Sequence, residues 1–393
     1  MKPITSWGAR RGRTALVALL VAALTAVIAY VAAARAPAIP GEAAPTPEMA
    51  SVPPHSTLGI PESFEIFVDS QPRPGWLYIL DSNDLLYESA RVVLLDPESG
   101  KVEAQYSAGY DPAAVLSPDG SVMYVASTVN SKSVVRALDT SSGRVLLEFG
   151  VLHRLGSIAP PKASYLAVSG DGTELYVLRM RTVTPGTDEF SVGVFDTGSG
   201  DLLRSLRLPD GCGVGFFVSD PDGNKPQAVC PGAVAVLEIA PGASQAPRAL
   251  ERSPVGVAQT RGRLLAISSS GILSVYETGD VTPGREVNLQ VGRPVRENGL
   301  IASGDGAMLF VATGENVASI EDVLVLDAQT LVPTGSIHFS RPVWSITPSH
   351  DGARLYGIER ATGSVSVIDV VAGGEAKRIE GVANDPAMAL VAP

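Results

Sequence analysis

The chain has 393 residues, and its 45% apolar content with 40 glycines and 30 prolines describes a turn-rich globular protein, not a disordered or collagen-like one. Acidic residues number 41 against 30 basic ones, and five of the bases lie in the first 35 residues, which contain no acid. The remainder therefore has 41 acids against 25 bases, a net charge of −16, without a Lys/Arg cluster. Because nucleic-acid binding needs a basic patch, the composition argues against a nucleic-acid partner.

Residues 14–34 form an uncharged, apolar run. A helix of that length, at about 1.5 Å of rise per residue, spans a hydrocarbon layer about 30 Å thick. Four bases precede the run, so the positive-inside rule predicts a cytoplasmic basic N-terminus at residues 1–13 and export of everything after residue 34. We predict a transmembrane signal anchor at 14–34. A cleaved signal peptide is the alternative, because Ala32-Ala33-Ala34 fits a small-residue cleavage pattern.

Residues 35–62 are predicted to form a Pro-rich linker, since seven prolines lie between positions 36 and 62. Proline favours extended polyproline conformations and opposes a helix, so this segment is a stalk. The globular domain then occupies residues 63–393 on the extracytoplasmic side, either periplasmic or at the cell surface. Its contact with the membrane is through residues 14–34.

A turn that ends in glycine recurs along this domain, and a strand-like apolar run follows each copy. Tight hairpins need positive φ, which glycine adopts without strain and which aspartate tolerates. Successive turn glycines are separated by 39 to 52 residues. They are Gly75, Gly120, Gly172, Gly223, Gly262, Gly306 and Gly352.

A second turn, Asp-x-x-x-Gly, closes the next hairpin at 96–100, 139–143, 196–200 and 369–373. We interpret these aspartates as turn residues that accept amide hydrogens, not as catalytic groups. Four short strands repeated seven times predict an all-β fold, a seven-bladed β-propeller of four-stranded antiparallel blades. A seven-unit solenoid is the alternative.

The tail at 387–393 reads as one more strand without the rest of a unit. We expect it to return to the first blade and to pair with residues 76–80 as the innermost strand, which removes free sheet edges. The segment at 64–69 also precedes a turn and is the rival for that position.

Cys212 and Cys230 are the only cysteines, 18 positions apart in an exported domain. An oxidising compartment favours a disulfide between them, and in the chain-entropy model a loop of this size contributes roughly 3 kcal/mol. No histidine lies near either cysteine, so the sequence does not indicate a metal site there.

The repeats resemble YVTN-type propeller repeats, and most of residues 64–393 is similar to the heavy subunit of the bacterial quinoprotein amine dehydrogenases. The cysteine pair is the most specific part of the resemblance, because that family also places two cysteines in the corresponding blade. The four stretches that carry the resemblance are 77–129 (LYILDSNDLL to ASTV), 208–239 (LPDGCGVGFF to LEI), 323–339 (VLVLDAQTLVPTGSIHF) and 344–370 (WSITPSHDGARLYGIE to IDV).

The resemblance implies that this chain carries no cofactor. In that family a separate small subunit holds a tryptophan-derived quinone, and the propeller helps to shape the substrate channel. A channel aromatic of the family lies in a Gly-Phe-Leu-Pro stretch, which corresponds here to Gly109-Tyr110-Asp111-Pro112. Tyr110 is therefore the expected substrate-channel residue, whereas Asp111 and the membrane anchor depart from the family pattern.

The chain itself contains no common catalytic, nucleotide-binding or metal-binding motif, so we assign no catalytic residue. Asp220 to Asn224 is rich in oxygen ligands but lacks the spacing of a calcium loop, and Trp76 and Trp344 fit blade packing better than ligand stacking. Arg179, Arg181 and Arg341 could face the central channel and receive an anion, or could simply neutralise the acidic excess.

Three functions fit these observations. We expect a membrane-anchored extracytoplasmic propeller that acts as a scaffold or binding module. The alternative is a true heavy subunit of an amine-oxidising quinoprotein with a quinone-bearing small subunit as partner. A lactonase-like propeller enzyme is the third possibility, since propellers host many activities.

Overall fold

The computed structural model describes residues 73–82, 90–129, 132–151, 154–155, 165–184, 187–208, 216–218, 227–230, 235–238, 248–249, 254–277, 282–316 and 319–393. The chain divides into two compact units, residues 1–61 and 62–393, and all the described residues lie in the second. The predicted anchor at 14–34 and the whole linker at 35–62 fall outside the described residues. Within the described ranges, no helix is long and apolar enough to cross a membrane.

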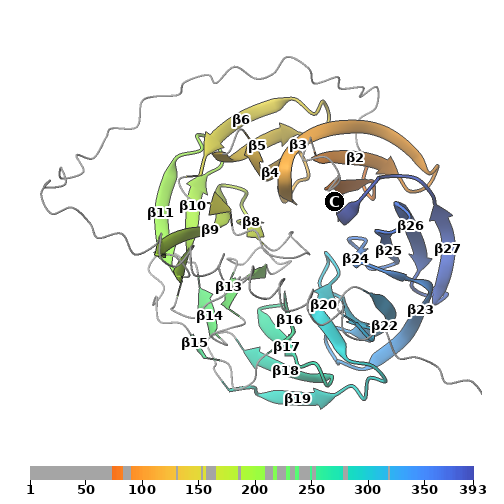
Figure 1. The fold of residues 1–393 in the computed structure, drawn as a ribbon. Helices are drawn as coiled ribbons and strands as arrows, with labels where there is room; N and C mark the ends of the chain where they lie inside the picture. The colour runs from red at the N-terminus through yellow and green to blue at the C-terminus, as the bar shows by residue number, and fades with distance from the viewer. Residues whose placement is uncertain are drawn as a thin grey trace, which may run out of the picture. The chain divides into compact units, whose positions relative to one another are not determined.

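The described strands form six hydrogen-bonded sheets with antiparallel pairing, arranged as a β-propeller (Figure 1). The first sheet has seven strands, and each later sheet has four or five. The first sheet contains, in spatial order, β28 (Pro386–Val391), β1 (Leu77–Asp81), β2 (Ala90–Asp96), β3 (Lys101–Leu116), β4 (Val122–Val129), β5 (Lys132–Asp139) and β6 (Val145–Gly150). The second contains β11 (Leu202–Arg207), β10 (Thr187–Asp196) and β9 (Glu174–Thr184), and both β7 (Arg154–Leu155) and β8 (Leu166–Val168) pair with β9.

The other four sheets each contain four consecutive strands in chain order. The third is β12 (Phe216–Val218), β13 (Gln227–Cys230), β14 (Ala235–Glu238) and β15 (Arg248–Ala249), and the fourth is β16 (Gly256–Thr260), β17 (Arg263–Ile267), β18 (Ile272–Glu277) and β19 (Arg285–Asn288). The fifth is β20 (Val295–Ala302), β21 (Met308–Thr313), β22 (Ile320–Asp327) and β23 (Pro333–Val343), and the sixth is β24 (Ser345–Pro348), β25 (Arg354–Glu359), β26 (Ser364–Asp369) and β27 (Gly374–Ile379).

The all-β propeller fold is confirmed, but the prediction of seven separate blades is corrected to six sheets among the described strands. The reason is the long strand β3. Its first part, residues 101–109, pairs with β2, and its second part, residues 110–116, pairs with β4. Gly109 has φ 77° at the point where the pairing changes sides. The first two repeat units are therefore joined in one continuous sheet.

The Ser-x-Asp-Gly turns share one hydrogen-bond pattern, which explains why the sequence repeats them. In each copy the serine hydroxyl donates to the aspartate Oδ1 at 2.6 Å, and the glycine has φ between 65° and 74°. The same carboxylate accepts a backbone N–H two residues later, at 2.9 to 3.1 Å. These carboxylates are turn residues. The four pairs are Ser117 with Asp119, Ser169 with Asp171, Ser303 with Asp305, and Ser349 with Asp351. The Asp-x-x-x-Gly aspartates are turn residues too, as predicted, because Asp96, Asp139, Asp196 and Asp369 each accept backbone amides of their own turn.

Two of the Asp-x-x-x-Gly turns, at 139–143 and 196–200, are hydrogen-bonded to the first turn of their repeat. Thr140 Oγ1 donates to the carbonyl of Gly120 at 2.7 Å, and Thr197 Oγ1 makes the same bond to Gly172. A further copy of this turn at 327–331 was missed by the sequence pattern, because Leu331 occupies the glycine position with φ 62°. In the repeats of Thr140 and Thr197 a side-chain hydrogen bond therefore fixes the two turns relative to each other.

The C-terminal tail closes the ring, as predicted. Strand β28 is antiparallel to β1, with Leu77 opposite Val391 and Leu80 opposite Met388. Past the strand end, the amide of Gly75 donates to the carbonyl of Ala392 at 2.9 Å. The rival segment at 64–69 lies outside the described residues. Because β28 comes last in the chain and β1 first among the described strands, the ring is closed by the pairing of the two ends.

Neighbouring sheets pack face to face through apolar clusters. The first and last sheets share one cluster, in which Leu77 and Ile79 of β1 lie with Tyr356 and Val365 of the last sheet. Along the ring, β8 contacts β12, β12 contacts β16, β16 contacts β20, β20 contacts β24, and β24 contacts β28. The core is therefore distributed between sheets, and each sheet depends on its neighbours for burial.

Removing the buried side chain of the closing strand should destabilise the whole domain. Met388 is buried, so Met388→Ala is expected to lower the free energy of unfolding by about 2–5 kcal/mol, the usual cost of a buried large-to-small change. The control is Val371→Ala, at a residue that is 89% exposed, which should change stability by less than about 0.5 kcal/mol. Denaturant unfolding measures both, and equal effects would contradict ring closure by the tail.

Acid should weaken the fold through the turn aspartates. The Ser169 hydroxyl, then the Thr173 amide and hydroxyl, lower the pKa of Asp171 from 3.8 to about 2. Because the folded-state pKa is depressed, this stabilisation is complete above pH 4 and is lost as the pH falls toward 2. Asp171→Asn should therefore be less stable than wild type at pH 7 and should show a smaller loss between pH 4 and pH 2. Urea unfolding midpoints of both proteins, measured across that pH range, provide the test. The same loss of stability in both proteins would contradict a stabilising role for the Asp171 carboxylate.

Candidate functional site

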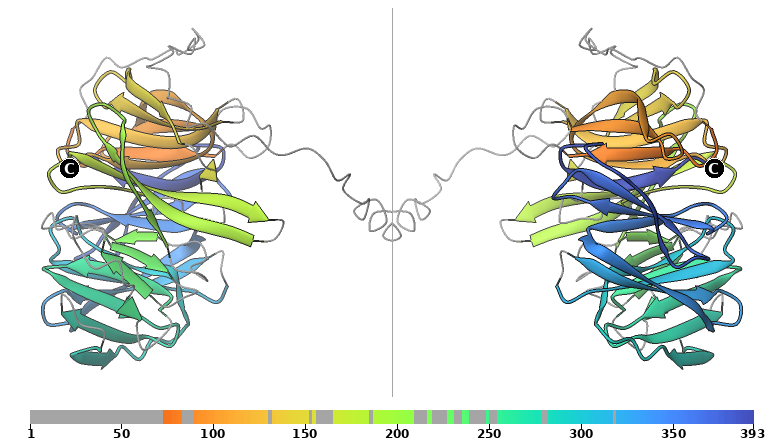
Figure 2. Two further views of the ribbon diagram at one scale, coloured as in Figure 1. Left: turned by 90° about the vertical axis from the view of Figure 1, so that its left-hand side faces the viewer. Right: turned by 90° about the vertical axis from the view of Figure 1, so that its right-hand side faces the viewer.

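The two faces of the ring differ, and one of them has a projecting hairpin. Strands β9 and β10 extend beyond the other strands, away from the side where the C-terminus lies (Figure 2). Among the described ladders, residues 181–184 pair only with residues 187–189. We call this side the ribbon face, and the side that carries the Ser-x-Asp-Gly turns and the C-terminus the turn face.

The main irregularity in an innermost strand lies in β20, where its chain enters from the ribbon face. Val295 pairs with Thr313 and Leu300 pairs with Val311, so the four residues 296–299 lie opposite the single residue Ala312. We call these four residues the β20 bulge. Bulges bend a strand and re-aim its side chains, and they are common beside binding and catalytic sites.

The bulge holds a strained backbone against a neighbouring sheet. Asn298 has φ 54°, and its amide donates to the carbonyl of Val255, just before β16, at 2.6 Å. A Cβ atom on Gly299 would lie 2.7 Å from the carbonyl oxygen of Arg296 and 2.8 Å from that of Ala312, so only glycine fits there. Non-glycine residues with positive φ persist when the surrounding structure enforces them, often at functional sites.

Two buried polar atoms of the bulge have no hydrogen-bond partner. They are Nε of Arg296 and Oδ1 of Asn298. The Arg296 side chain is held at its other end, where Nη1 donates to the carbonyl of Asn316. Burial lowers the pKa of the Arg296 guanidinium below its ordinary value. The same four-residue segment thus contains an unpaired donor and an unpaired acceptor.

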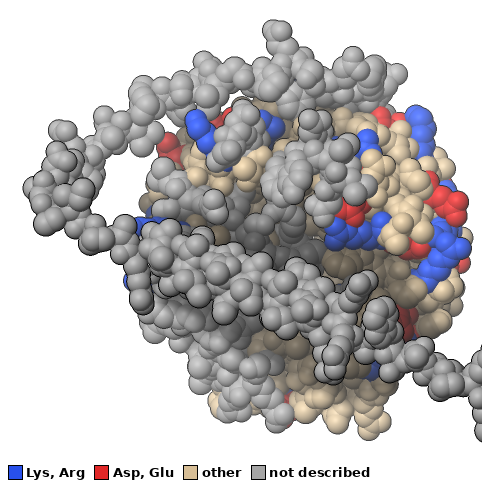
Figure 3. Space-filling model, in the orientation of Figure 1, with Lys and Arg blue, Asp and Glu red and all other residues tan. Residues whose placement is uncertain are grey.

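A network of charged residues flanks the bulge at the same end of the sheet. Arg293 donates to Glu321 and, at 3.0 Å, to Asp322, and Asp322 also meets Nδ1 of His338 at 2.7 Å. These groups neutralise one another, and basic and acidic residues are likewise interspersed over the visible described surface in Figure 3. In the part of the chain that is described, no group of three or more His, Cys, Asp or Glu side chains is placed to hold a metal ion.

The β20 bulge therefore contains unpaired polar atoms, whereas the charged residues beside it are already paired. The unpaired groups are one donor, the Nε–H of Arg296, and one acceptor, the Oδ1 of Asn298. Sequence reasoning missed it. The available signal was the dipeptide Asn298-Gly299 inside an apolar strand pattern, since an isolated glycine there indicates a bulge or a close backbone approach.

The structure leaves the predicted site residues largely untested. Tyr110 lies in β3 opposite Thr128, and its side chain is outside the described set. Cys230 ends β13 opposite Ala235, while Cys212 falls outside the described residues, so the disulfide remains a prediction. The oxygen-rich turn at 220–224 also lies outside them.

The arginines and tryptophans singled out in the sequence occupy different environments. Arg179 is buried between two sheets, whereas Arg341 is exposed on β23. Trp76 is buried in the core of the first sheet, in agreement with a packing role. Trp344 lies under the guanidinium of Arg360, whose Cζ is 5.0 Å from the ring centre. None of these residues is part of the β20 bulge at 296–299.

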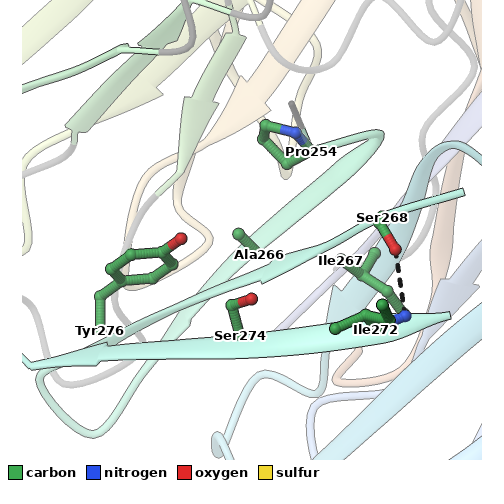
Figure 4. Close-up of a pocket in the computed structure, with 7 residues that line it drawn as sticks. All are labelled: Pro254, Ala266, Ile267, Ser268, Ile272, Ser274 and Tyr276. Carbon is green, nitrogen blue, oxygen red and sulfur yellow. Dashed lines mark hydrogen bonds between the residues drawn. The ribbon is translucent and has the colours of Figure 1, made fainter. Parts of the chain in front are cut away.

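A cavity also lies beside β17 and β18 (Figure 4). It has about 10 Å³ of space for water, enough for about one molecule. Its lining is mainly apolar, and the Ser268 hydroxyl is already used by the amide of Ile272 at 3.1 Å. This cavity is too small for an organic ligand. The lining residues are Pro254, Ala266, Ile267, Ser268, Ile272, Ser274 and Tyr276.

Comparison with known proteins identifies the fold and no family. No family model and no curated protein matches the chain. A protein of unknown function from Desulfotomaculum acetoxidans DSM 771 matches with a TM-score of 0.58 and 11% identity, over 81% of this chain and 98% of that one. The dihydro-heme d1 dehydrogenase NirN, solved in complex with DHE, matches with 0.53 and 20%, over 87% and 79%. A candidate 6-phosphogluconolactonase from Bacteroides fragilis NCTC 9343 matches with 0.54 and 15%, over 81% and 97%. At these identities the likeness establishes the propeller fold alone.

Substitutions at Asn298 test whether the bulge stores backbone strain. Asn298→Gly should unfold at the same or a higher denaturant concentration than wild type, because glycine adopts φ 54° freely. Asn298→Ala removes the same side-chain amide but keeps a Cβ, and it should be about 1–2 kcal/mol less stable than the glycine variant. Equal stability of the two variants would contradict a strained left-handed residue at this position.

Proposed function

We propose that the protein is a β-propeller scaffold that binds a partner or ligand at the ribbon face through the β20 bulge. The observation that carries the proposal is the strained bulge in an innermost strand, with the buried Arg296 Nε and Asn298 Oδ1 unpartnered. Leaving such atoms unpaired costs free energy, and a ligand that pairs with them would recover it. Binding is favoured over catalysis because the flanking acids and Arg293 are engaged with one another.

We further propose that residues 14–34 anchor this scaffold in the membrane and that residues 35–62 hold it away from the bilayer on the extracytoplasmic side. The uncharged run, the preceding bases and the prolines of the linker support this placement. A Cys212–Cys230 disulfide fits the same compartment.

The alternative is a heavy subunit of an amine-oxidising quinoprotein. Its support is the resemblance of the four stretches described above, together with the match of Tyr110 to a channel aromatic. In that case the tryptophan-derived quinone would reside on a separate small subunit, and this chain would contribute the channel wall. The lactonase-like possibility is supported only by the shared fold with a candidate 6-phosphogluconolactonase.

Site-directed photo-crosslinking distinguishes these functions in the full-length, membrane-inserted protein. A photoreactive amino acid at position 297 replaces the exposed Glu297 of the bulge, and the matched control is the same residue at Val371 on the turn face. We expect a discrete adduct from position 297 in the native host and none from position 371.

The identity of the adduct separates the alternatives. A small protein that stains for quinone redox cycling would support the amine-dehydrogenase heavy subunit, whereas a quinone-negative adduct would support the scaffold. Equal labelling from both positions, or none from position 297, would refute a binding role for the bulge.

A further inference from the structure

Arg179 is the largest fully buried side chain among the described residues, with 2% of its surface exposed. It lies on β9 and faces the sheet that contains β4, β5 and β6. At this interface the ring centroids of Phe149 from one sheet and Phe195 from the other are 5.1 Å apart. Its Cζ is 5.9 Å from the centre of the Phe195 ring. A Cβ on Gly193 would come within 2.8 Å of Arg179 Nε, so that glycine makes the space that the guanidinium occupies.

The buried guanidinium has little polar compensation. Nη2 donates to Ser205 Oγ at 2.6 Å, and Nε has no partner. No carboxylate within the described ranges pairs with it. Burial lowers the pKa of Arg179 below its ordinary value, and no neighbouring charge is among the causes of the shift. A buried cation without an anion is costly, and proteins normally pair such a group.

A second buried arginine shows the usual solution. Arg136 on β5 is buried, and its Nε donates to Glu148 at 2.6 Å. Side chains alternate along strands, so this pair lies on the opposite face of its sheet from Val135, which faces Arg179. Arg136 is therefore a matched residue that is also buried but has its own carboxylate.

The side chains around Arg179 increase the positive charge at this interface. By strand alternation Arg181, Ser191 and Arg207 share its sheet face, and the described acid there, Glu189, already pairs with Arg207 at 3.1 Å. The opposing sheet presents uncharged residues at the corresponding positions. They are Thr128, Ser133, Val135, Phe149 and Val151. The region is basic although the chain as a whole is acidic.

Arg179 lies close to solvent along the strand. Two residues further along β9, Arg181 is exposed, and a step of two residues is about 6.6 Å. Arg207, opposite Ser191 on β11, has 63% of its side chain exposed. The guanidinium itself points inward, toward Gly193 and Ser205, which lie two residues further from the ribbon face than Arg179 does. A small anion would therefore have to enter between the two sheets, past Arg181, to reach it.

We propose that Arg179, with Ser205, forms an anion site between the β3–β6 and β9–β11 strands that takes the oxyanion group, carboxylate or phosphate, of a small ligand. The planar fork of arginine matches both groups, and the unpaired Nε–H belongs to the edge that binds an oxyanion in bidentate fashion. Arg181 at the solvent end attracts the anion. This site is separate from the β20 bulge and does not depend on its function.

Thermal unfolding of the full-length protein in detergent tests the site, with inorganic phosphate and acetate as probes at constant ionic strength in chloride. Saturating anion should raise the melting temperature of wild type by a few degrees. Arg136→Met should retain the shift, because it leaves Arg179 intact. Arg179→Met should lose the shift, and Arg179→Lys, which keeps the charge but not the fork, should show a smaller one.

Each outcome decides the proposal. The probe that gives the larger shift identifies the ligand group as phosphate or carboxylate. No shift in wild type, or an equal shift in Arg179→Met, would overturn the site. In chloride alone, Arg179→Met should melt no lower than wild type, because it removes an unpaired buried charge. A large loss of stability there would instead make Arg179 a packing residue. If the methionine variant does not fold, an undiminished shift in Arg179→Lys is the overturning result.

Discussion

Backbone pairing between the last strand and the first described strand holds the propeller together. The carboxylate of Asp81 at the end of β1 is fully buried, and it accepts the amides of Asn384 and Asp385 at 3.1 and 2.8 Å. Arg91 adds an ion pair at 2.9 Å. A buried carboxylate is stabilising only when it is this well satisfied, so the start of β28 is fixed to the first sheet by charge-assisted bonds as well as by strand pairing.

The closure also positions the polar residues of the ribbon face. Asp385 accepts the hydroxyl of Ser82 at 2.9 Å and pairs with Arg360, which in turn lies over the ring of Trp344. This chain of contacts links the first sheet to the last. Because every sheet packs against its neighbours, an open ring would leave two sheet faces exposed, and the β20 bulge would lose the rigid frame that keeps its strained backbone in place.

Local turn chemistry explains why much of the fold could be predicted from the sequence. Asp-Gly requires a tight hairpin wherever it occurs, so turns such as the one at Gly120 could be located without knowledge of the rest of the structure. Leu331 shows the limit of that approach. It adopts φ 62° without being glycine, and its side chain is only 1% exposed, so burial in the core offsets the backbone strain. A pattern that requires glycine cannot detect such a turn.

Non-local pairing explains what the sequence could not predict. Repeat spacing marks the units but does not show that β3 continues from one unit into the next, which merges two expected blades into one sheet. The same limit applies to the candidate sites. Arg136 pairs with Glu148, directly opposite it on the next strand, but the lack of a carboxylate beside Arg179 depends on which sheet faces meet. The sequence allowed two roles for Arg179, channel anion site or charge balance, and the observed burial between sheets matches neither location.

Native-state hydrogen exchange of the β28 amides tests ring closure most directly. We expect the amides of Met388 to Val391 to exchange as slowly as those of the central strands β25 and β26, because opening this strand requires disruption of the core shared by the first and last sheets. Exchange of these amides at the rate of an unprotected chain, with β25 and β26 still protected, would contradict the claim that the tail holds the ring closed.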